Sequence, residues 1–135
     1  SSALAADARD LPFPIRRPPT PEGWKPNSGS TQSVGGTRVS NVGWITSDGA
    51  YVQLSQTNAK EEDLVYHLGG GDALGSGTRQ IGGHEWVAYQ TEDGKKFWIT
   101  DLGDVRIAVL SRGPDDAMER LAASTVAQQP LPGRT

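Results

Sequence analysis

The stretch GWITSDGAYVQLSQTN, residues 43–58, decides the class of fold that this chain adopts. Apolar and polar residues alternate on both sides of a central Asp48-Gly49 pair, which is typical of two half-buried strands. An Asp-Gly pair supplies the positive φ angles that a tight hairpin turn requires. The sequence therefore predicts a β-hairpin whose strands lie at 38–46 and 50–56.

A second group of strands is predicted farther along the chain. Runs of apolar and β-branched residues alternate with turn residues, among them a second Asp-Gly pair at Asp93-Gly94. Three strands that follow one another through tight turns are antiparallel by necessity, so they form a meander. The predicted strands lie at 80–91, 96–100 and 105–110.

Two helices accompany these strands. The first is predicted at 58–68, where Asn58 is placed to cap the helix and Gly69 to end it. The second is predicted at 114–126, because Pro114 suits a first helical position and apolar residues recur on one face. The chain is therefore predicted to be an α+β protein. In it the hairpin and the three-stranded meander form an antiparallel sheet packed against the C-terminal helix, with one short helix between them.

The distribution of proline, glycine and polar residues predicts the organisation of the chain. Residues 1–33 form a Pro-rich leader, because six of the nine prolines lie there. Residues 34–127 form a single α+β domain, and residues 128–135 form a disordered tail. The segment 26–36 is predicted to be a loop or a weak edge strand, and the glycine-rich segment 69–79 a flexible loop.

The predicted sheet has two faces, and the C-terminal helix covers only one of them. Strand parity gives the second face a mixture of apolar and polar side chains, so something must cover it. The first interpretation is that the leader, with Trp24, and the short helix cover it. The alternative is a surface of aromatic and amide side chains that contacts a ligand or a partner. The candidates for such an exposed binding surface are Tyr51, Tyr89 and Trp98.

The composition excludes several classes of function. The formal net charge is −3, with 13 basic and 16 acidic residues mixed along the chain, so the basic excess typical of nucleic-acid binding is missing. The chain has no cysteine, which excludes disulfides, thiolate metal sites and a cysteine nucleophile. No apolar run approaches the ~20 residues that a membrane-spanning helix needs.

The sequence predicts no catalytic residue, no metal site and no cofactor. His84-Glu85 begins like a metalloprotease motif, but no second histidine follows four residues later and the pair falls in a predicted strand. The glycines at 69–77 match neither the dinucleotide pattern nor the P-loop. An alternative that stays open is an enzyme in which His84 works with an acidic residue.

Several short motifs carry a resemblance to a known family. They are PEGW at 21–24, NVGWITSDGAYVQLSQ at 41–56, GGHEW at 82–86 and VRIAVLSRG at 105–113, followed by a helix rich in Leu and Ala. From about Leu11 to the end of that helix, the chain resembles the actinobacterial family catalogued as Domain of Unknown Function 4245. The family carries no established active-site residues, so the resemblance implies no catalytic role for any position.

The resemblance implies a location. Members of the family typically have one N-terminal membrane-spanning segment followed by a domain on the outer side of the cytoplasmic membrane. This chain lacks that segment and begins where the external domain would begin, which makes the leader membrane-proximal. We therefore expect a non-enzymatic binding or accessory module of the cell envelope, whose partner is an envelope protein or ligand. The alternatives are an enzyme acting on an envelope component and a subunit of a membrane protein complex.

Overall fold

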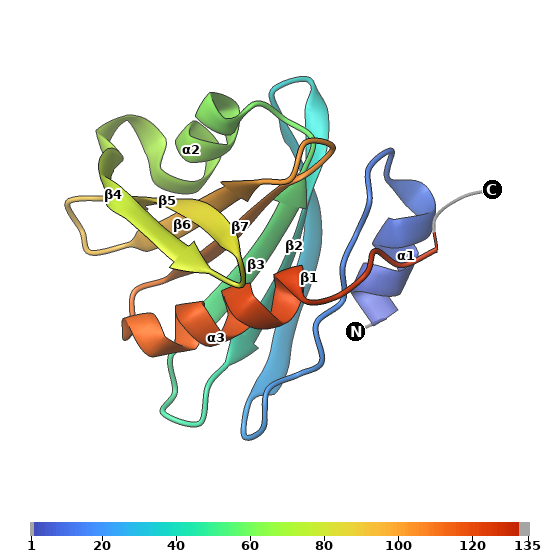
Figure 1. Ribbon diagram of the computed structural model, residues 1–135, viewed down its shortest axis with the longest axis horizontal. Helices are drawn as coiled ribbons and strands as arrows, with labels where there is room; N and C mark the ends of the chain where they lie inside the picture. The colour runs from blue at the N-terminus through green and yellow to red at the C-terminus, as the bar shows by residue number, and fades with distance from the viewer. Residues whose placement is uncertain (1, 133–135) are drawn as a thin grey trace.

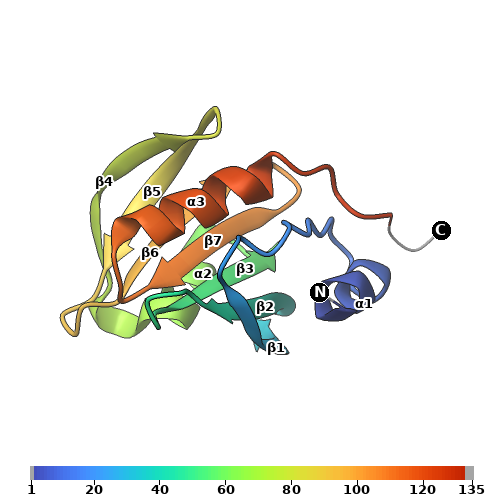
Figure 2. The same ribbon diagram turned by 90° about the horizontal axis from the view of Figure 1, so that it is seen from below.

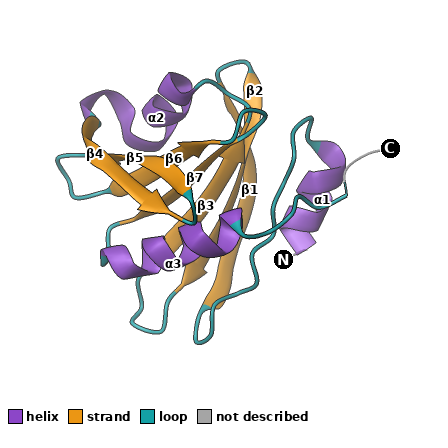
Figure 3. Cartoon of the chain, in the orientation of Figure 1, coloured by secondary structure: helices purple, strands orange, loops and turns teal. Residues whose placement is uncertain are grey.

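A computed structural model describes residues 2–132 of the protein, and in this part of the chain seven strands form one antiparallel sheet (Figure 1). The strand order is β1-β2-β3-β7-β6-β5-β4, and three α-helices and one short 3₁₀ turn accompany the sheet (Figure 3). The predicted α+β class is confirmed. The elements are α1 (Ser2–Asp10), β1 (Lys25–Val34), β2 (Thr37–Ile45), β3 (Tyr51–Thr57), α2 (Glu61–Gly69), η1 (Gly70–Asp72), β4 (Leu74–Ile81), β5 (His84–Gln90), β6 (Lys96–Asp101), β7 (Arg106–Ser111) and α3 (Asp115–Val126).

The predicted hairpin and meander are both confirmed. Strands β2 and β3 pair antiparallel, and Gly49 in the turn between them has a φ of 85°. Strands β5, β6 and β7 form the meander. Strand β3 also pairs with β7, with Leu54 opposite Val109, and this pairing joins the hairpin and the meander into one sheet.

The region around 69–91 corrects the sequence prediction. The segment predicted as a flexible loop holds β4, and the strand predicted at 80–91 is broken by a turn. Gly82 and Gly83 have φ angles of 61° and 81°, the positive values that a two-residue hairpin turn needs at both positions. The Gly-Gly pair was the signal for this turn. Strands β4 and β5 therefore form a second hairpin at one edge of the sheet.

The opposite edge is β1, which the sequence predicts as a loop or a weak edge strand. It is a ten-residue strand, nine of whose residues are exposed, and it pairs antiparallel with β2. The register shifts between Pro26 and Ser28, as expected for a proline at an edge. Strand β1 spans the predicted boundary between the leader and the domain.

The first face of the sheet carries α3 and the leader together (Figure 2). Met118 and Leu121 of α3 are fully buried and belong to the same apolar cluster as Ile15 and Trp24 of the leader. Gln56, also fully buried, fastens the leader to β3, because its side-chain amide exchanges hydrogen bonds of 2.8 and 2.9 Å with the backbone of Arg16. The expectation that the leader covers the second face is therefore wrong.

The second face is covered in part by α2. Leu64 and Leu68 of this helix pack on Val39, Phe97 and neighbouring apolar residues. The short helix thus lies where the first interpretation placed it.

Asn58 does not cap α2, which corrects the prediction. The N-cap residue of α2 is Lys60, and no side chain caps that end. The side-chain oxygen of Asn58 instead accepts a 2.7 Å hydrogen bond from the Thr37 hydroxyl, which draws it toward β2.

The chain beyond α3 returns to the leader. The N–H of Leu131 donates a 2.8 Å hydrogen bond to the carbonyl of Ile15. The tail predicted as disordered extends to 135, and residues 133–135 lie outside the described residues. Within residues 2–132 none of the helices is long and apolar enough to cross a membrane.

The burial of the leader predicts that it contributes to stability. Ile15→Ala should lower the free energy of unfolding by about 3 kcal/mol, because it removes buried apolar atoms and leaves a cavity. Urea unfolding of the whole chain measures this value. Arg17→Ala, two residues away at an exposed position, is the matched control and should change it by less than about 0.5 kcal/mol. Equal effects of the two variants would contradict the assignment of the leader to the core.

Candidate functional site

A cleft opens on the first face between strand β4 and the start of α3, and we call it the β4–α3 cleft. Its volume is about 450 Å³. Its lining combines hydroxyl, amide and charged groups with one indole, from three strands and a helix. The lining includes Thr78, Arg79, Gln90, Lys96, Trp98 and Asp115.

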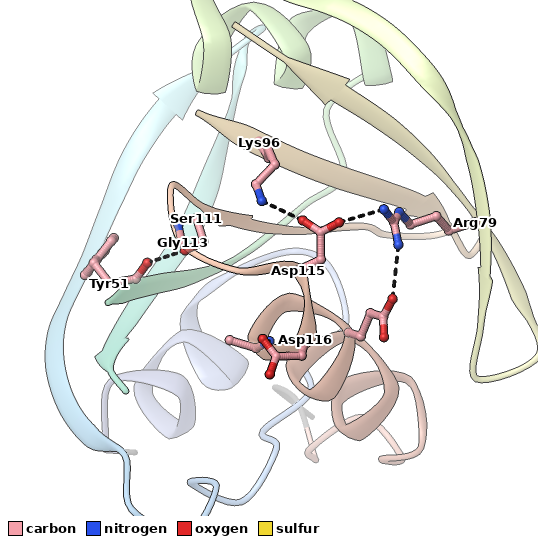
Figure 4. A network of polar contacts seen from close by, with 9 residues as sticks. Tyr51, Arg79, Lys96, Ser111, Gly113, Asp115 and Asp116 are labelled. Atoms are coloured by element: carbon pink, nitrogen blue, oxygen red, sulfur yellow. Dashed lines mark hydrogen bonds and ion pairs between the residues drawn. The ribbon is translucent and has the colours of Figure 1, made fainter. Parts of the chain in front are cut away.

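Asp115, the first residue of α3, joins the walls of this cleft (Figure 4). Its carboxylate oxygens lie 2.7 Å from Nη2 of Arg79 and 2.5 Å from Nζ of Lys96. Nη1 of Arg79 lies 3.0 Å from Oε1 of Glu119. The hydrogen bond from Lys96 is the largest cause that lowers the pKa of the Asp115 carboxyl below its ordinary value.

These ion pairs satisfy the charges of the cleft within the protein itself. Two cations face two carboxylates, so no uncompensated charge remains in this group to attract an ion. The contacts link β4, β6 and α3 across the cleft. These three ion pairs hold the edge hairpin of β4 and β5 against α3, and we call them the latch.

Trp98 forms part of the wall of the cleft from β6, and its position corrects an expectation. The residue is only 2% exposed and belongs to the apolar cluster of the first face. The guanidinium carbon of Arg79 lies 4.3 Å from the centroid of the Trp98 ring, a cation–π contact that covers the indole. The expectation of an exposed Trp98 is wrong, because parity turns its side chain toward α3.

Tyr89 lies on the second face and fastens α2 to the sheet. Its ring stacks on Phe97 with centroids 5.3 Å apart, and its hydroxyl donates a hydrogen bond to the carboxylate of Glu61 on α2. Burial, followed by the hydrogen bond to Glu61, raises the pKa of Tyr89 to about 12. The hydroxyl therefore stays protonated at neutral pH and acts as a donor.

Tyr51 also lies on the second face, at the start of β3. Its ring lies over Gly43 of β2 so closely that a Cβ at that glycine would come within 2.4 Å of the ring. The structure does not bring the three predicted residues together. Tyr51 and Tyr89 share a face but are separated by two strands, and Trp98 is on the opposite face.

Tyr51 belongs instead to a hydrogen-bonded group that the sequence prediction did not assemble. Its hydroxyl donates to Oε1 of Gln53 over 3.0 Å. Nε2 of Gln53 donates to Oδ1 of Asn41, which also accepts a 2.6 Å bond from the Ser55 hydroxyl. Nδ2 of Asn41 donates to Oε1 of Gln32 over 3.0 Å, and the Ser28 and Tyr51 hydroxyls lie 3.3 Å apart. We call this group, which spans β1, β2 and β3, the polar row: Ser28, Gln32, Asn41, Tyr51, Gln53 and Ser55.

The polar row has a buried base, formed by Asn41 and Ser55, and an exposed rim, formed by Ser28 and Gln32. Ser55 is fully buried and Asn41 is 5% exposed, whereas Ser28 and Gln32 on the edge strand are exposed. No member carries a charge at neutral pH, and each offers a hydroxyl or an amide. Strand parity predicts half of the polar row from the sequence, since the alternation in 51–56 puts Tyr51, Gln53 and Ser55 on one face. Only the pairing with β1 and β2 adds the other three.

The two histidines lie apart from both places. His84 begins β5, and His67 lies on α2 beside a different cavity, also lined by Asp63 and Tyr66. Burial lowers the pKa of His67. Within residues 2–132, no three His, Cys, Asp or Glu side chains are grouped so that they could hold a metal ion.

The fold and the polar row define a small α+β protein with the leader and α3 on one sheet face, and with α2 and the polar row on the other. The chain belongs to the family described as "Protein of unknown function (DUF4245)", whose model matches residues 1–125. The resemblance carried by the hairpin and the strand motifs is thereby confirmed. No curated protein and no solved structure matches the chain.

The latch predicts a pH-dependent contribution to stability. Because the pKa of Asp115 in the folded protein lies below its ordinary 3.8, the charged carboxylate stabilises the fold. This contribution is present above the unfolded pKa and is lost as the pH falls through the folded pKa. Asp115→Asn should lower the free energy of unfolding by roughly 0.5–1 kcal/mol near neutral pH, since the partly exposed pairs are screened.

Urea unfolding at a series of pH values from neutral to strongly acidic measures the difference between wild type and variant. The difference should shrink to nothing at the acid end. Asp116→Asn is the control, because this carboxylate lies in the same first turn of α3 but makes no ion pair with a described residue. A difference for Asp115→Asn that stays constant with pH would contradict the latch.

Proposed function

We propose that the protein is a non-enzymatic binding module of the cell envelope that recognises its ligand or partner through the polar row. The proposal places the domain on the outer face of the cytoplasmic membrane, tethered by a single N-terminal segment. The family resemblance supports this location. The observation that carries the binding role is the polar row itself, an open, uncharged and internally hydrogen-bonded group on the second face.

The internal hydrogen bonds favour binding because they fix the side chains beforehand. Long amide side chains on an open sheet face lose rotamer freedom when they contact a ligand, which reduces affinity. In the polar row, Gln53 and Asn41 are already held by their neighbours. A ligand that meets this face therefore orders few side chains that were free before.

The polar row supports a binding role better than the β4–α3 cleft does. A ligand entering the cleft would have to break ion pairs between Arg79, Lys96 and Asp115, because these groups already satisfy one another. The rim of the polar row has exposed groups available for new hydrogen bonds.

Photo-crosslinking from the polar row tests the binding role. Ser30 is exposed on β1 and lies opposite Asn41, so a benzophenone amino acid placed there borders the row without replacing a member. In the cells that make the full-length protein, irradiation should yield one defined adduct, identified by mass spectrometry. The same substitution at Ser76, an exposed serine on the other edge strand, is the matched control. The same adducts from both positions, or none from position 30, would sink the proposal.

The chain offers a simple test of the proposed location, because it has no cysteine. A single Ser30→Cys variant of the full-length protein should react with a membrane-impermeant maleimide in intact cells. Labelling should not increase when the cells are permeabilised, because an exposed residue outside the membrane is already accessible. Labelling that appears only after permeabilisation would place the domain inside the cell. The wild-type protein gives the background.

A further inference from the structure

The Tyr51 ring forms a flat platform within the polar row. The hydroxyl end of the ring, at Cε1, Cζ and Oη, lies against Gly43, where the missing side chain lets the phenol approach the backbone of β2. The residue is only partly buried, so part of it stays accessible to solvent. The hydroxyl is held between Gln53 and Ser28. The ring is therefore held by its contact with Gly43 and by the two hydrogen-bonding partners of its hydroxyl.

Hydrogen-bonding groups surround the Tyr51 ring, and they differ in how many of their donors and acceptors already have a partner in the protein. Both N–H groups of Gln53 are donated inside the row, to Asn41 and Ser55. At the exposed rim, Oε1 of Gln32 accepts from Asn41, while its Nε2 has no partner within residues 2–132. The Ser28 and Ser30 hydroxyls are exposed beside it. The base of the row is saturated, and the rim retains both donors and acceptors.

The lack of charge narrows the class of ligand. A bound phosphate or carboxylate would lose water without gaining a cation, because no member of the polar row is charged. A purely apolar ligand would bury the amides without partners, which is also unfavourable. A neutral molecule with hydroxyl groups on its edge and C–H groups on its flat side satisfies both requirements. Sugar rings have this form, since their C–H faces pack on aromatic rings and their hydroxyls donate and accept.

We propose that the polar row binds a neutral oligosaccharide, which stacks one sugar ring on Tyr51 and directs its hydroxyls to Ser28 and Gln32 of β1. This assignment rests on the proposed binding function and names its ligand class. The row runs across three adjacent strands, so it has room for more than one sugar ring. A protein partner is a different outcome, which the experiment separates.

NMR titration of the ¹⁵N-labelled whole chain with three neutral probes, cellotriose, maltotriose and chitotriose, tests the assignment. At least one probe should shift the side-chain amide signals of Gln32, Asn41 and Gln53. Tyr51→Ala should weaken that binding by about tenfold, since it removes the stacking surface. Tyr66→Ala removes a tyrosine that is 70% exposed on α2 and should leave binding unchanged.

Two further variants guard against effects on folding. Tyr51→Phe keeps the ring and loses only the hydroxyl, so it should bind more tightly than Tyr51→Ala. Gly43→Ala keeps Tyr51 but displaces its ring, because the new Cβ would lie within 2.4 Å of it, and should weaken binding. No shift with any probe, shifts confined to residues outside the row, or full binding by Tyr51→Ala would overturn the assignment.

The outcomes also separate this inference from the function on which it rests. A Ser30 crosslink to a protein, together with no response to the three probes, would overturn the saccharide and keep the binding role. Failure of both experiments would overturn both. Signals in the row that shift with protein concentration alone would identify a second copy of the chain as the occupant, and would also overturn the saccharide.

Discussion

The pairing of β3 with β7 is the interaction on which the rest of the structure depends. It sets Val52 opposite Ser111 and Leu54 opposite Val109, and so joins a hairpin and a meander that local turns have already formed. A two-stranded hairpin alone is marginal in water, and a sheet gains stability when more strands share one apolar face. With this pairing made, both faces become continuous surfaces. The leader, α2 and α3 then have something to pack against.

The distribution of the covering elements explains why the polar row stays partly open on the second face. The leader and α3 both lie on the first face, where Ile15, Trp24 and Leu121 share a cluster. Among the described helices α2 covers the second face, where it packs on Val34 and Val39 of β1 and β2 as well as on Phe97 of β6. The polar row lies beside this cluster, farther along β1, β2 and β3, where Asn41 pairs with Ser55 and Gln32 is opposite Val39. Its side chains are amides and hydroxyls because water or a ligand, and not a helix, meets them there.

The β4–α3 cleft and the polar row show two ways in which a protein treats exposed polar groups. In the cleft, Arg79, Lys96 and Asp115 neutralise one another and hold an edge hairpin to a helix. In the row, neutral groups such as Asn41 and Gln53 bond to each other and leave the rim unsatisfied. In the cleft the polar groups are fully engaged in contacts that stabilise the fold. In the row some donors and acceptors remain available for new hydrogen bonds. This difference directs the functional proposal to the row.

The sequence by itself determined the hairpin, the meander and the C-terminal helix, because Asp-Gly turns and apolar periodicity act over a few residues. It also placed Tyr51 on a different face from Val52, since parity is local. It did not determine that Trp98 is buried under Arg79, nor that Tyr51 joins Gln32 in one row, because strands far apart in the sequence make those contacts. Strand β4 was missed because its glycines interrupt the alternation typical of a strand, although the Gly82-Gly83 turn pairs it with its neighbour β5. Register between distant strands, which only the tertiary structure decided, turned six scattered polar residues into one hydrogen-bonded group.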